Sequence, residues 1–366
     1  MRLRVGFDAR LLAHEQNPTG VGWYTRHLIQ ALRDRADISL TLYSDAPIAS
    51  ASSDWVRVLR RWPGLPWQQT VLPWALRRDH PAVYHSPSFS IPLHTGIPTV
   101  VTIHDLSFDR YPQYVRPETR QYLQRMVPAS IRRAHRIITP SRQVAEELVS
   151  RYRLSAAQAE HLRPIALGVD VERWHPVGPE TLAAVRRELG LPFPYLVFVG
   201  TREPRKNLTR LVQAFGRPEA HTDGVYLVLV GPEGFSGEKL NQLIQQTPRV
   251  HPLAYVQADR LPAVVQGALG LCYVSEYEGF GLPVLEAMAV GTPVLTSPGS
   301  AMEETAGPWA FYALPTDVED IASGLARLIE DGEERRRIRQ TAIKAASRYT
   351  WTETALRTAE VYKELA

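Results

Sequence analysis

The chain of 366 residues has a single cysteine and no apolar run long enough for a signal peptide or a membrane span. One cysteine excludes an intramolecular disulfide. Because Cys272 lies in the apolar run from Leu269 to Val274, we expect it at a buried strand position. Together these absences indicate a cytoplasmic protein that is neither secreted through a signal peptide nor integral to a bilayer.

The sequence also lacks Asp-x-Asp pairs and histidine clusters with metal-ligand spacing. The histidines of the first half are scattered without a repeating interval; they are His14, His27, His80, His85, His94, His104, His135 and His161. We therefore expect no metal site and no cofactor.

Lysine is scarce, because arginine supplies all but four of the 42 basic residues. Residues 1–170 carry 22 Lys+Arg against 14 Asp+Glu, whereas residues 171–366 carry 20 against 24. The first half is therefore basic, at +8, and the second is acidic, at −4. Such a bias concerns partners more than fold, and the preference for arginine has genome composition as its alternative explanation.

Short apolar, β-branched runs alternate with helical patterns in both halves of the chain. The runs are Leu3–Phe7, Ile38–Tyr43, Val83–His85, Thr99–His104, Ile137–Pro140, Tyr195–Gly200, Val225–Gly231, Leu271–Ser275 and Pro293–Ser297. Strands that are apolar throughout and separated by helices predict parallel sheets covered on both faces. Since the length also exceeds that of one core, we expect an α/β protein with two Rossmann-like domains. The predicted boundary lies near residue 170, and a helix near Pro179–Leu189 opens the second domain.

Two glutamates enclose a glycine loop and a helix start in the segment Glu278-Gly-Phe-Gly-Leu-Pro-Val-Leu-Glu286. Pro283 suits a first helical turn, and Gly291 marks the helix end. Free N–H groups at such a start favour a diphosphate, which two carboxylates would repel unless they face another group. Sugar hydroxyls are such a group. One glutamate can hold a ribose and the other a hexose.

A second motif, Gly200-Thr-Arg-Glu-Pro-Arg-Lys-Asn207, ends a predicted strand and leads into a helix near Leu208. Arg202, Arg205 and Lys206 predict a cationic clamp. Fixed cations directed at a departing diphosphate would stabilise a transition state more than a ground state.

These motifs resemble the nucleotide-sugar site of retaining glycosyltransferases with the GT-B fold, specifically glycosyltransferase family 4. The resemblance covers nearly the whole chain and includes three further segments. They are Thr19-Gly-Val-Gly-Trp-Tyr-Thr25, Gly291-Thr-Pro-Val294 and Glu303-Glu-Thr-Ala-Gly307. It implies two Rossmann-like domains facing an interdomain cleft, an acceptor-binding domain at 1–170 with a helix at 352–366 crossing back, and a nucleotide-sugar-binding domain at 171–351.

The resemblance also implies roles for individual residues. Catalytic roles fall on His104, Glu278, Arg205 and Lys206, and donor-binding roles on Gly20, Gly22, Arg202, Tyr255, Val256, Leu261, Gly279, Phe280, Gly281, Leu282 and Glu286. Arg202 departs from some relatives, which place an arginine where this chain has Thr201. His104 would otherwise be read as a packed or capping residue, and the resemblance implies a contact with the donor hexose. Backbone groups near Tyr255 and Val256 would read the base, so the side chains leave the base undetermined.

The expected activity is retaining transfer of a hexose from a nucleoside diphosphate to a saccharide or lipid-linked acceptor. Since no carboxylate is placed as a nucleophile, we expect departure and attack on one face of the sugar. Bacterial mannosyltransferases of O-antigen and exopolysaccharide assembly resemble the chain most, which makes GDP-mannose the first donor, before UDP-glucose or UDP-N-acetylglucosamine. Nucleic acid is not an expected partner. The alternatives are a GT-B nucleotide-sugar epimerase and a non-catalytic nucleotide-sugar-binding protein. A dinucleotide-dependent oxidoreductase is less well supported, because this sequence lacks the third glycine of the dinucleotide-binding fingerprint.

Tryptophan and arginine interleave in two segments of the first half, residues 55–62 and 67–78. The arginines are Arg57, Arg60, Arg61, Arg77 and Arg78, and the tryptophans are Trp55, Trp62, Trp67 and Trp74. This composition suits a peripheral contact with an anionic membrane, at the inner face of the cytoplasmic membrane. The alternative is that the tryptophans pack into the core of the first domain.

Overall fold

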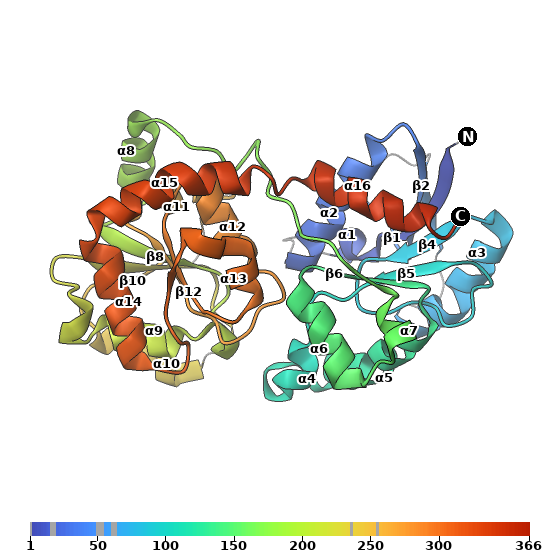
Figure 1. Ribbon diagram of the computed structural model, residues 1–366, viewed down its shortest axis with the longest axis horizontal. Coiled ribbons are helices and arrows are strands. Elements are labelled where there is room, and N and C mark those ends of the chain that lie inside the picture. Colours follow the sequence, from blue (N-terminus) through green and yellow to red (C-terminus); the bar gives the residue numbers. More distant parts are fainter. Residues whose placement is uncertain (1, 15–19, 49–54, 60–63, 235–236, 254–255) are drawn as a thin grey trace. The chain divides into compact units, whose positions relative to one another are not determined.

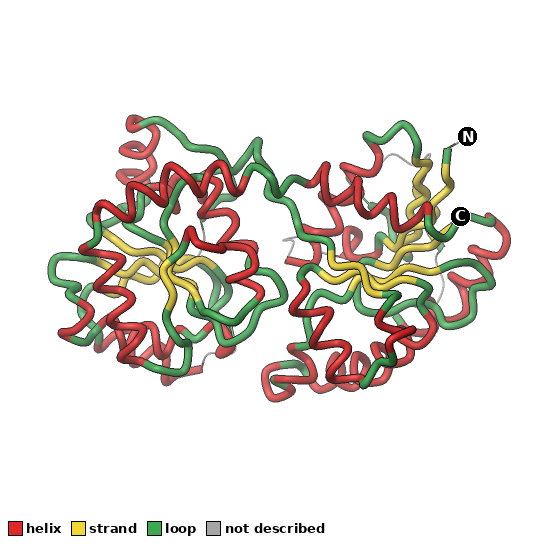
Figure 2. Tube along the Cα trace, viewed as in Figure 1, coloured by secondary structure: helices red, strands yellow, loops and turns green. Residues whose placement is uncertain are grey.

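The computed structural model describes residues 2–14, 20–48, 55–59, 64–234, 237–253 and 256–366. The chain divides into two compact units, Met1–Gly168 with Trp351–Ala366, and Val169–Thr350. Each unit is built on one parallel sheet with helices on its faces, as Figures 1 and 2 show. The predicted α/β class with two Rossmann-like domains is confirmed. The units divide two residues before the predicted position of 170, and the returning segment begins at Trp351.

The first unit holds a seven-stranded sheet in the order β3-β2-β1-β4-β5-β6-β7. Its strands are β1 (Leu3–Asp8), β2 (Ile38–Ser44), β3 (Val56–Val58), β4 (Val83–Ser86), β5 (Thr99–Thr102), β6 (Arg136–Thr139) and β7 (Leu162–Pro164). Every residue of β4 and β5 is buried, because helices cover both faces of the sheet there. The apolar runs in the sequence reflect this two-sided burial.

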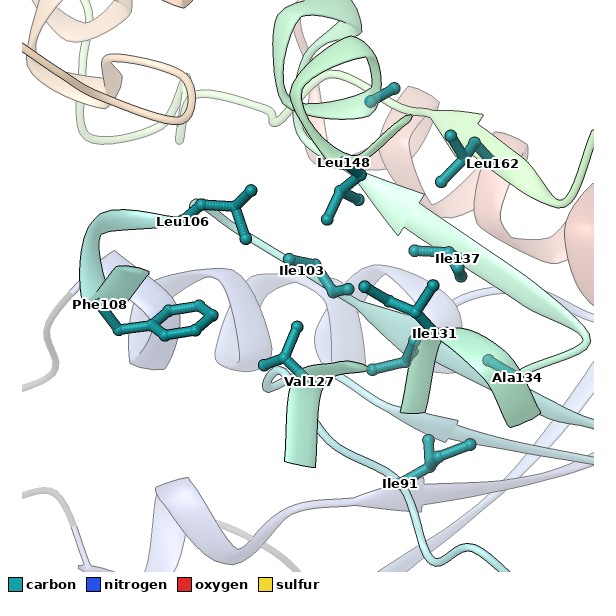
Figure 3. Packing of buried hydrophobic residues seen from close by; sticks show 12 residues of the cluster. Ile91, Ile103, Leu106, Phe108, Val127, Ile131, Ala134, Ile137, Leu148 and Leu162 are labelled. Atoms are coloured by element: carbon teal, nitrogen blue, oxygen red, sulfur yellow. The ribbon is translucent and has the colours of Figure 1, made fainter. Parts of the chain in front are cut away.

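The helices of the first unit include one that follows the second unit in the sequence. They are α1 (Arg10–His14), α2 (Gly20–Arg33), η2 (Trp67–Val71), α3 (Leu72–Asp79), α4 (Ser107–Arg110), η3 (Pro112–Tyr114), α5 (Pro117–Arg133), α6 (Arg142–Tyr152), α7 (Ala156–Ala159) and α16 (Trp351–Lys363). Helix α16 packs against α2, where Trp351 stacks on His27 with ring centroids 5.1 Å apart (Figure 1). Figure 3 shows part of the core of this unit, in which Phe108, Val127 and Ile131 pack with Ile103 and Ile137.

The second unit holds a six-stranded sheet in the order β10-β9-β8-β11-β12-β13. Its strands are β8 (Tyr195–Val199), β9 (Tyr226–Val230), β10 (Val250–Leu253), β11 (Leu271–Tyr273), β12 (Val294–Thr296) and β13 (Phe311–Tyr312). Its helices are α8 (Pro179–Glu188), η4 (Pro204–Lys206), α9 (Leu208–Phe215), η5 (Pro218–Ala220), α10 (Gly237–Gln246), α11 (Leu261–Gln266), α12 (Leu282–Ala289), α13 (Ala301–Ala306), η6 (Gly307–Trp309), α14 (Val318–Glu330) and α15 (Gly332–Ala346). Cys272 is fully buried in β11, at the predicted strand position.

The tryptophan- and arginine-rich segments are divided between core and surface. Trp67 is fully buried, whereas Trp74 of α3 is 61% exposed. Val56–Val58 forms an edge strand, and Arg60, Arg61 and Trp62 lie outside the described residues. Among the described residues, no helix combines the length and the apolar character that crossing a bilayer requires.

Candidate active site

The loops after β8 and β11 meet at one edge of the sheet in the second unit. These strands are neighbours and parallel, so their carboxyl ends lie at the same edge. In the sheet, β9 and β10 lie on one side of β8, and β11 to β13 lie on the other. This is the topological switch point at which open parallel sheets bind ligands.

Glu278, after β11, accepts contacts from three donors through its Oε1 atom. Arg205 Nη1 lies 2.8 Å away, Lys206 Nζ lies 3.7 Å away, and the Tyr273 hydroxyl donates at 3.0 Å. The side chain is 13% exposed. Burial raises the pKa of Glu278, but the charges of Arg205 and Lys206 and the hydrogen bonds outweigh it, so the pKa is lowered overall. Glu278 is therefore ionised near neutral pH.

Lys206 is fixed from both the backbone and the side-chain end. It closes η4, and the next residue, Asn207, is left-handed with φ 61°. The Asn207 amide donates to the carbonyls of Val274 and Pro315, at 3.0 and 2.6 Å, which ties the turn to the strand ends around it. Lys206 Nζ donates to the Tyr273 hydroxyl at 2.7 Å, and burial lowers its pKa more than the charge of Glu278 raises it.

Gly200 leaves room for that lysine. Its φ of 147° lies in the region that favours glycine, and a Cβ atom there would stand 3.0 Å from Lys206 Nζ. The backbone conformation therefore favours glycine after β8, and the missing side chain also leaves space for the Lys206 ammonium group.

The three cations predicted to form a clamp are each paired with carboxylates. Arg205 also pairs with Glu203 at 3.0 Å, so two carboxylates balance it. Arg202 is 5% exposed and pairs with Glu233, at 3.5 Å, rather than with Glu278. Arg205 and Lys206 are brought together with Glu278 as the motif suggested, and Arg202 is not part of that group.

The helix α12 begins directly beside this cluster. Gly281, with φ 95°, precedes it, and no side chain caps its first turn. The loop from Gly279 is buried, and the Phe280 carbonyl accepts a hydrogen bond from Thr305 at 3.0 Å. Backbone N–H groups at Gly281 and Leu282 precede the first residues with intrahelical bonds, and this arrangement suits an anion.

Glu286 lies one turn inside α12, in a different environment from Glu278. Burial raises its pKa to about 7, while Arg173, Lys206 and a hydrogen bond from the indole of Trp174 lower it less. The like charge of Asp170 also raises it. Asp170, Arg173 and Trp174 belong to the segment after the domain boundary, which sequence reasoning treated only as a junction. A tryptophan in an apparent linker was the one available signal, and Trp174 is 3% exposed.

His104 lies two residues after β5 in the first unit, because the strand ends earlier than predicted, at Thr102. It is 8% exposed, and its Nε2 donates to the Pro87 carbonyl at 2.7 Å. Burial lowers the pKa of His104 more than Pro87 and Asp105 raise it, which favours the neutral ring. Asp105 accepts a hydrogen bond from the Ser107 backbone at 2.9 Å and so caps the following turn.

The remaining predicted site residues are placed as follows. Gly20 and Gly22 lie within the first turn of α2. Gly22 is buried, which leaves Gly20 as the glycine with open space around it. Val256 is buried and Leu261 opens α11, while Tyr255 lies outside the described residues. The described parts of the chain contain no cluster of three or more His, Cys, Asp and Glu side chains suited to a metal ion.

Two family sequence models match the chain. The model described as "Glycosyl transferases group 1" matches residues 185–345, and that described as "Glycosyltransferase Family 4" matches residues 18–173. The first of these ranges includes every residue of the cluster around Glu278.

Individual proteins match over most of their length. O-antigen chain mannosyltransferase B of Escherichia coli is 29% identical, covering 95% of this chain and 96% of that protein. MMP alpha-(1->4)-mannosyltransferase of Mycolicibacterium hassiacum is 28% identical over 74% of this chain and 66% of its own. The crystal structure of Anabaena HepE in complex with UDP and glucose superposes with a TM-score of 0.76 at 19% identity, over 99% of this chain and 100% of that chain.

Proposed function

The chain belongs to the family 4 glycosyltransferases with the GT-B fold, and from this premise we propose that it transfers mannose from GDP-mannose, with retention, to a saccharide or lipid-linked acceptor. The observation that carries the donor site is the cluster of Glu278, Arg205 and Lys206 beside the start of α12. The two cations and the N–H groups of the helix start supply positive potential for a leaving diphosphate. Glu278 supplies an ionised acceptor for hexose hydroxyls.

The ribose contact falls to Glu286. Its carboxylate is held by the indole of Trp174, one turn further along α12 than the phosphate groups would lie. A vicinal diol can donate to such a carboxylate, and this contact would persist throughout the reaction. Glu286 therefore contributes to nucleotide affinity rather than to the chemical step.

Mannose is favoured because two relatives that match most of this chain are named as mannosyltransferases. UDP-glucose is the second candidate, because the superposed HepE structure is a complex with UDP and glucose. The proposed countercharge to the diphosphate consists of Arg205, Lys206 and the helix start. Transfer should therefore survive EDTA.

His104 is proposed to hydrogen-bond the donor hexose. With Nε2 donating to the Pro87 carbonyl and the ring neutral, Nδ1 carries the lone pair that can accept from a sugar hydroxyl. No carboxylate is assigned as a nucleophile, so we propose attack from the face that the diphosphate leaves.

A peripheral membrane contact is proposed for the surface formed by β3 and α3. Trp74 is 61% exposed, and Arg57 and Arg78 have side chains that are 61% and 67% exposed. An aromatic ring flanked by cations suits the interface of an anionic bilayer. Asp79, which lies near both arginines, partly offsets their charge.

The test of the proposed function is a panel of nucleotide sugars, with release of nucleoside diphosphate measured with and without saccharide and lipid-linked acceptors. GDP-mannose should give acceptor-dependent release, and NMR should show the anomeric configuration of the donor in the product. A nucleotide-sugar epimerase would convert the donor without any acceptor, and a binding protein would give no turnover. Inversion at the anomeric carbon would overturn the retaining mechanism alone.

A further inference from the structure

A chain of hydrogen bonds runs through the core of the first unit, from the C-terminal helix to the neighbourhood of His104. The Tyr362 hydroxyl of α16 lies 2.6 Å from His85 Nδ1, and His85 Nε2 lies 2.8 Å from Thr102 Oγ1. Thr102 Oγ1 in turn lies 2.9 Å from the Tyr24 hydroxyl of α2. These hydrogen bonds join four elements, α16, β4, β5 and α2.

Because these four side chains are buried, each hydrogen bond of the series depends on its protein partner. The four side chains are at most 1% exposed, so water cannot replace a missing partner. Burial lowers the pKa of His85 to about 3, so its ring is neutral, with one nitrogen donating and the other accepting. One of the two hydroxyls at the His85 ring, Tyr362 or Thr102, therefore donates to a ring nitrogen, and the other accepts from the opposite ring nitrogen. Loss of one hydroxyl leaves the next group unpaired.

The chain ends at the ring that packs on His104. The ring of Tyr24 meets the His104 imidazole edge to face, with centroids 4.7 Å apart and planes at 79°. Phe89 contacts the same imidazole with centroids 5.6 Å apart. Since the hydroxyl of Tyr24 is hydrogen-bonded to Thr102, its ring cannot move away from His104 without breaking that hydrogen bond.

The His104 ring is held in one orientation by these contacts and by the Pro87 carbonyl. A carbonyl only accepts, so Nε2 must carry the hydrogen and Nδ1 must be the acceptor. A rotation of the ring would carry Nδ1 away from the direction that it now faces. The wall that Tyr24 forms opposes such a rotation.

We propose that Tyr24, Thr102, His85 and Tyr362 form a positioning chain that fixes the orientation of His104 for its contact with the donor sugar. The inference rests on the role proposed above for His104. Tyr24 acts through His104 and not on the substrate. Through Tyr362, the C-terminal helix contributes to the geometry of a residue more than 250 positions earlier in the sequence.

The test is a double-mutant cycle on turnover of GDP-mannose, or of whichever donor in the panel gives turnover. Tyr24→Phe and Tyr362→Phe each keep the ring and remove only the hydroxyl. Each should lower kcat by ~10-fold with the donor KM changed less than ~2-fold, as expected for lost orientation of a reacting group. In a His104→Ala background the same changes should cause no further loss, because the residue that they orient is absent.

A matched control removes a buried tyrosine hydroxyl from the second unit. Tyr195 donates to the Val264 carbonyl at 2.6 Å, and Tyr195→Phe should leave kcat unchanged. If Tyr24→Phe fails to fold by circular dichroism, Thr102→Val and Thr102→Ser replace it. The valine removes the hydroxyl and the serine retains it, so only the valine should lower kcat.

The inference would be overturned if Tyr24→Phe and Tyr362→Phe lowered kcat by the same factor in the parent protein and in the His104→Ala variant. Normal kcat in folded Tyr24→Phe and Tyr362→Phe would also overturn it. Either result would leave the transfer reaction in place. Normal kcat in His104→Ala would overturn the sugar contact and with it the positioning chain. A parent protein that turns over no donor would overturn the proposed function as well.

Discussion

Glu278 and Glu286 are the same residue type in opposite electrostatic settings, eight positions apart. Glu278 is paired with two cations, which lower its pKa, whereas burial raises the pKa of Glu286 to about 7. The spacing in the sequence predicted that the two carboxylates would have separate tasks. It could not predict the difference in ionisation, because Tyr273, Asp170 and Trp174 belong to segments without a recognisable motif.

Removing the charge of Glu278 or of Lys206 should stop transfer without unfolding the protein. Glu278→Gln and Lys206→Ala are each expected to lower kcat by at least ~100-fold, because both groups act where charge develops or where the hexose is oriented. Glu276→Gln is the control. Glu276 lies two residues earlier and pairs with Arg210, outside the cluster. Near-normal turnover in both site variants would remove the proposed donor site.

Nucleotide affinity should depend on pH through Glu286. With a pKa of about 7, its ionised fraction rises from about a tenth at pH 6 to about nine-tenths at pH 8. Only the ionised carboxylate accepts from both ribose hydroxyls with full strength, so calorimetry should show GDP binding more tightly at pH 8 than at pH 6. The Glu286→Gln variant should bind weakly and without this slope. An equal slope in the variant would assign the titration to another group.

The sequence did not predict the strands at the edges of the two sheets, or the exact ends of some of the other strands. The central strands are apolar throughout and were found, whereas β3, β7, β10 and β13 were missed. These strands are short and include exposed or half-buried positions, so their hydrophobic pattern is weak. The predicted ends also extended too far, as at His104, because apolar residues continue beyond the last ladder pair.

The start of α12 depends on one backbone conformation. Gly281 has φ 95°, and a Cβ atom there would lie 2.8 Å from Met302 Cγ. Gly281→Ala should therefore reduce the free energy of unfolding by ~2–4 kcal/mol and displace the phosphate-facing N–H groups. Gly224→Ala is the matched control, since Gly224 has φ 74° with no atom within 4 Å and should lose only ~1 kcal/mol. Urea unfolding measures both changes. Equal losses of unfolding free energy in Gly281→Ala and Gly224→Ala would show that Met302 moves away from the new methyl group at no cost.

At the scale of the whole molecule, the basic character of residues 1–170 concerns the choice of partner more than the fold. Part of that charge lies on the exposed surface of β3 and α3, beside Trp74. The sequence could not separate Trp74 from Trp67, which lies under Arg10 in the core, because both occur in the same composition of tryptophan and arginine.

Binding to anionic vesicles should require that surface. Replacing Arg57, Arg78 and Trp74 with serine is expected to reduce cosedimentation with phosphatidylglycerol vesicles at low salt by at least ~10-fold, at ~1 kcal/mol for each arginine. Donor hydrolysis in solution should survive. A control triple variant, Arg187→Ser, Arg217→Ser and Arg337→Ser, alters only the second unit. No vesicle binding by the parent protein, or equal losses in both variants, would exclude this membrane contact.

Because α16 belongs to the first unit, the second unit is an insertion between two parts of the first. During synthesis on a ribosome, residues 169–350 can complete their sheet while the first unit still lacks Trp351 and Tyr362. His85 Nδ1 then lacks its partner, the Tyr362 hydroxyl, which is translated after the second unit. The order of folding should therefore be the reverse of the order of translation. The second unit becomes resistant to proteolysis first, and the unit whose strands emerge earliest is completed only when α16 has left the exit tunnel.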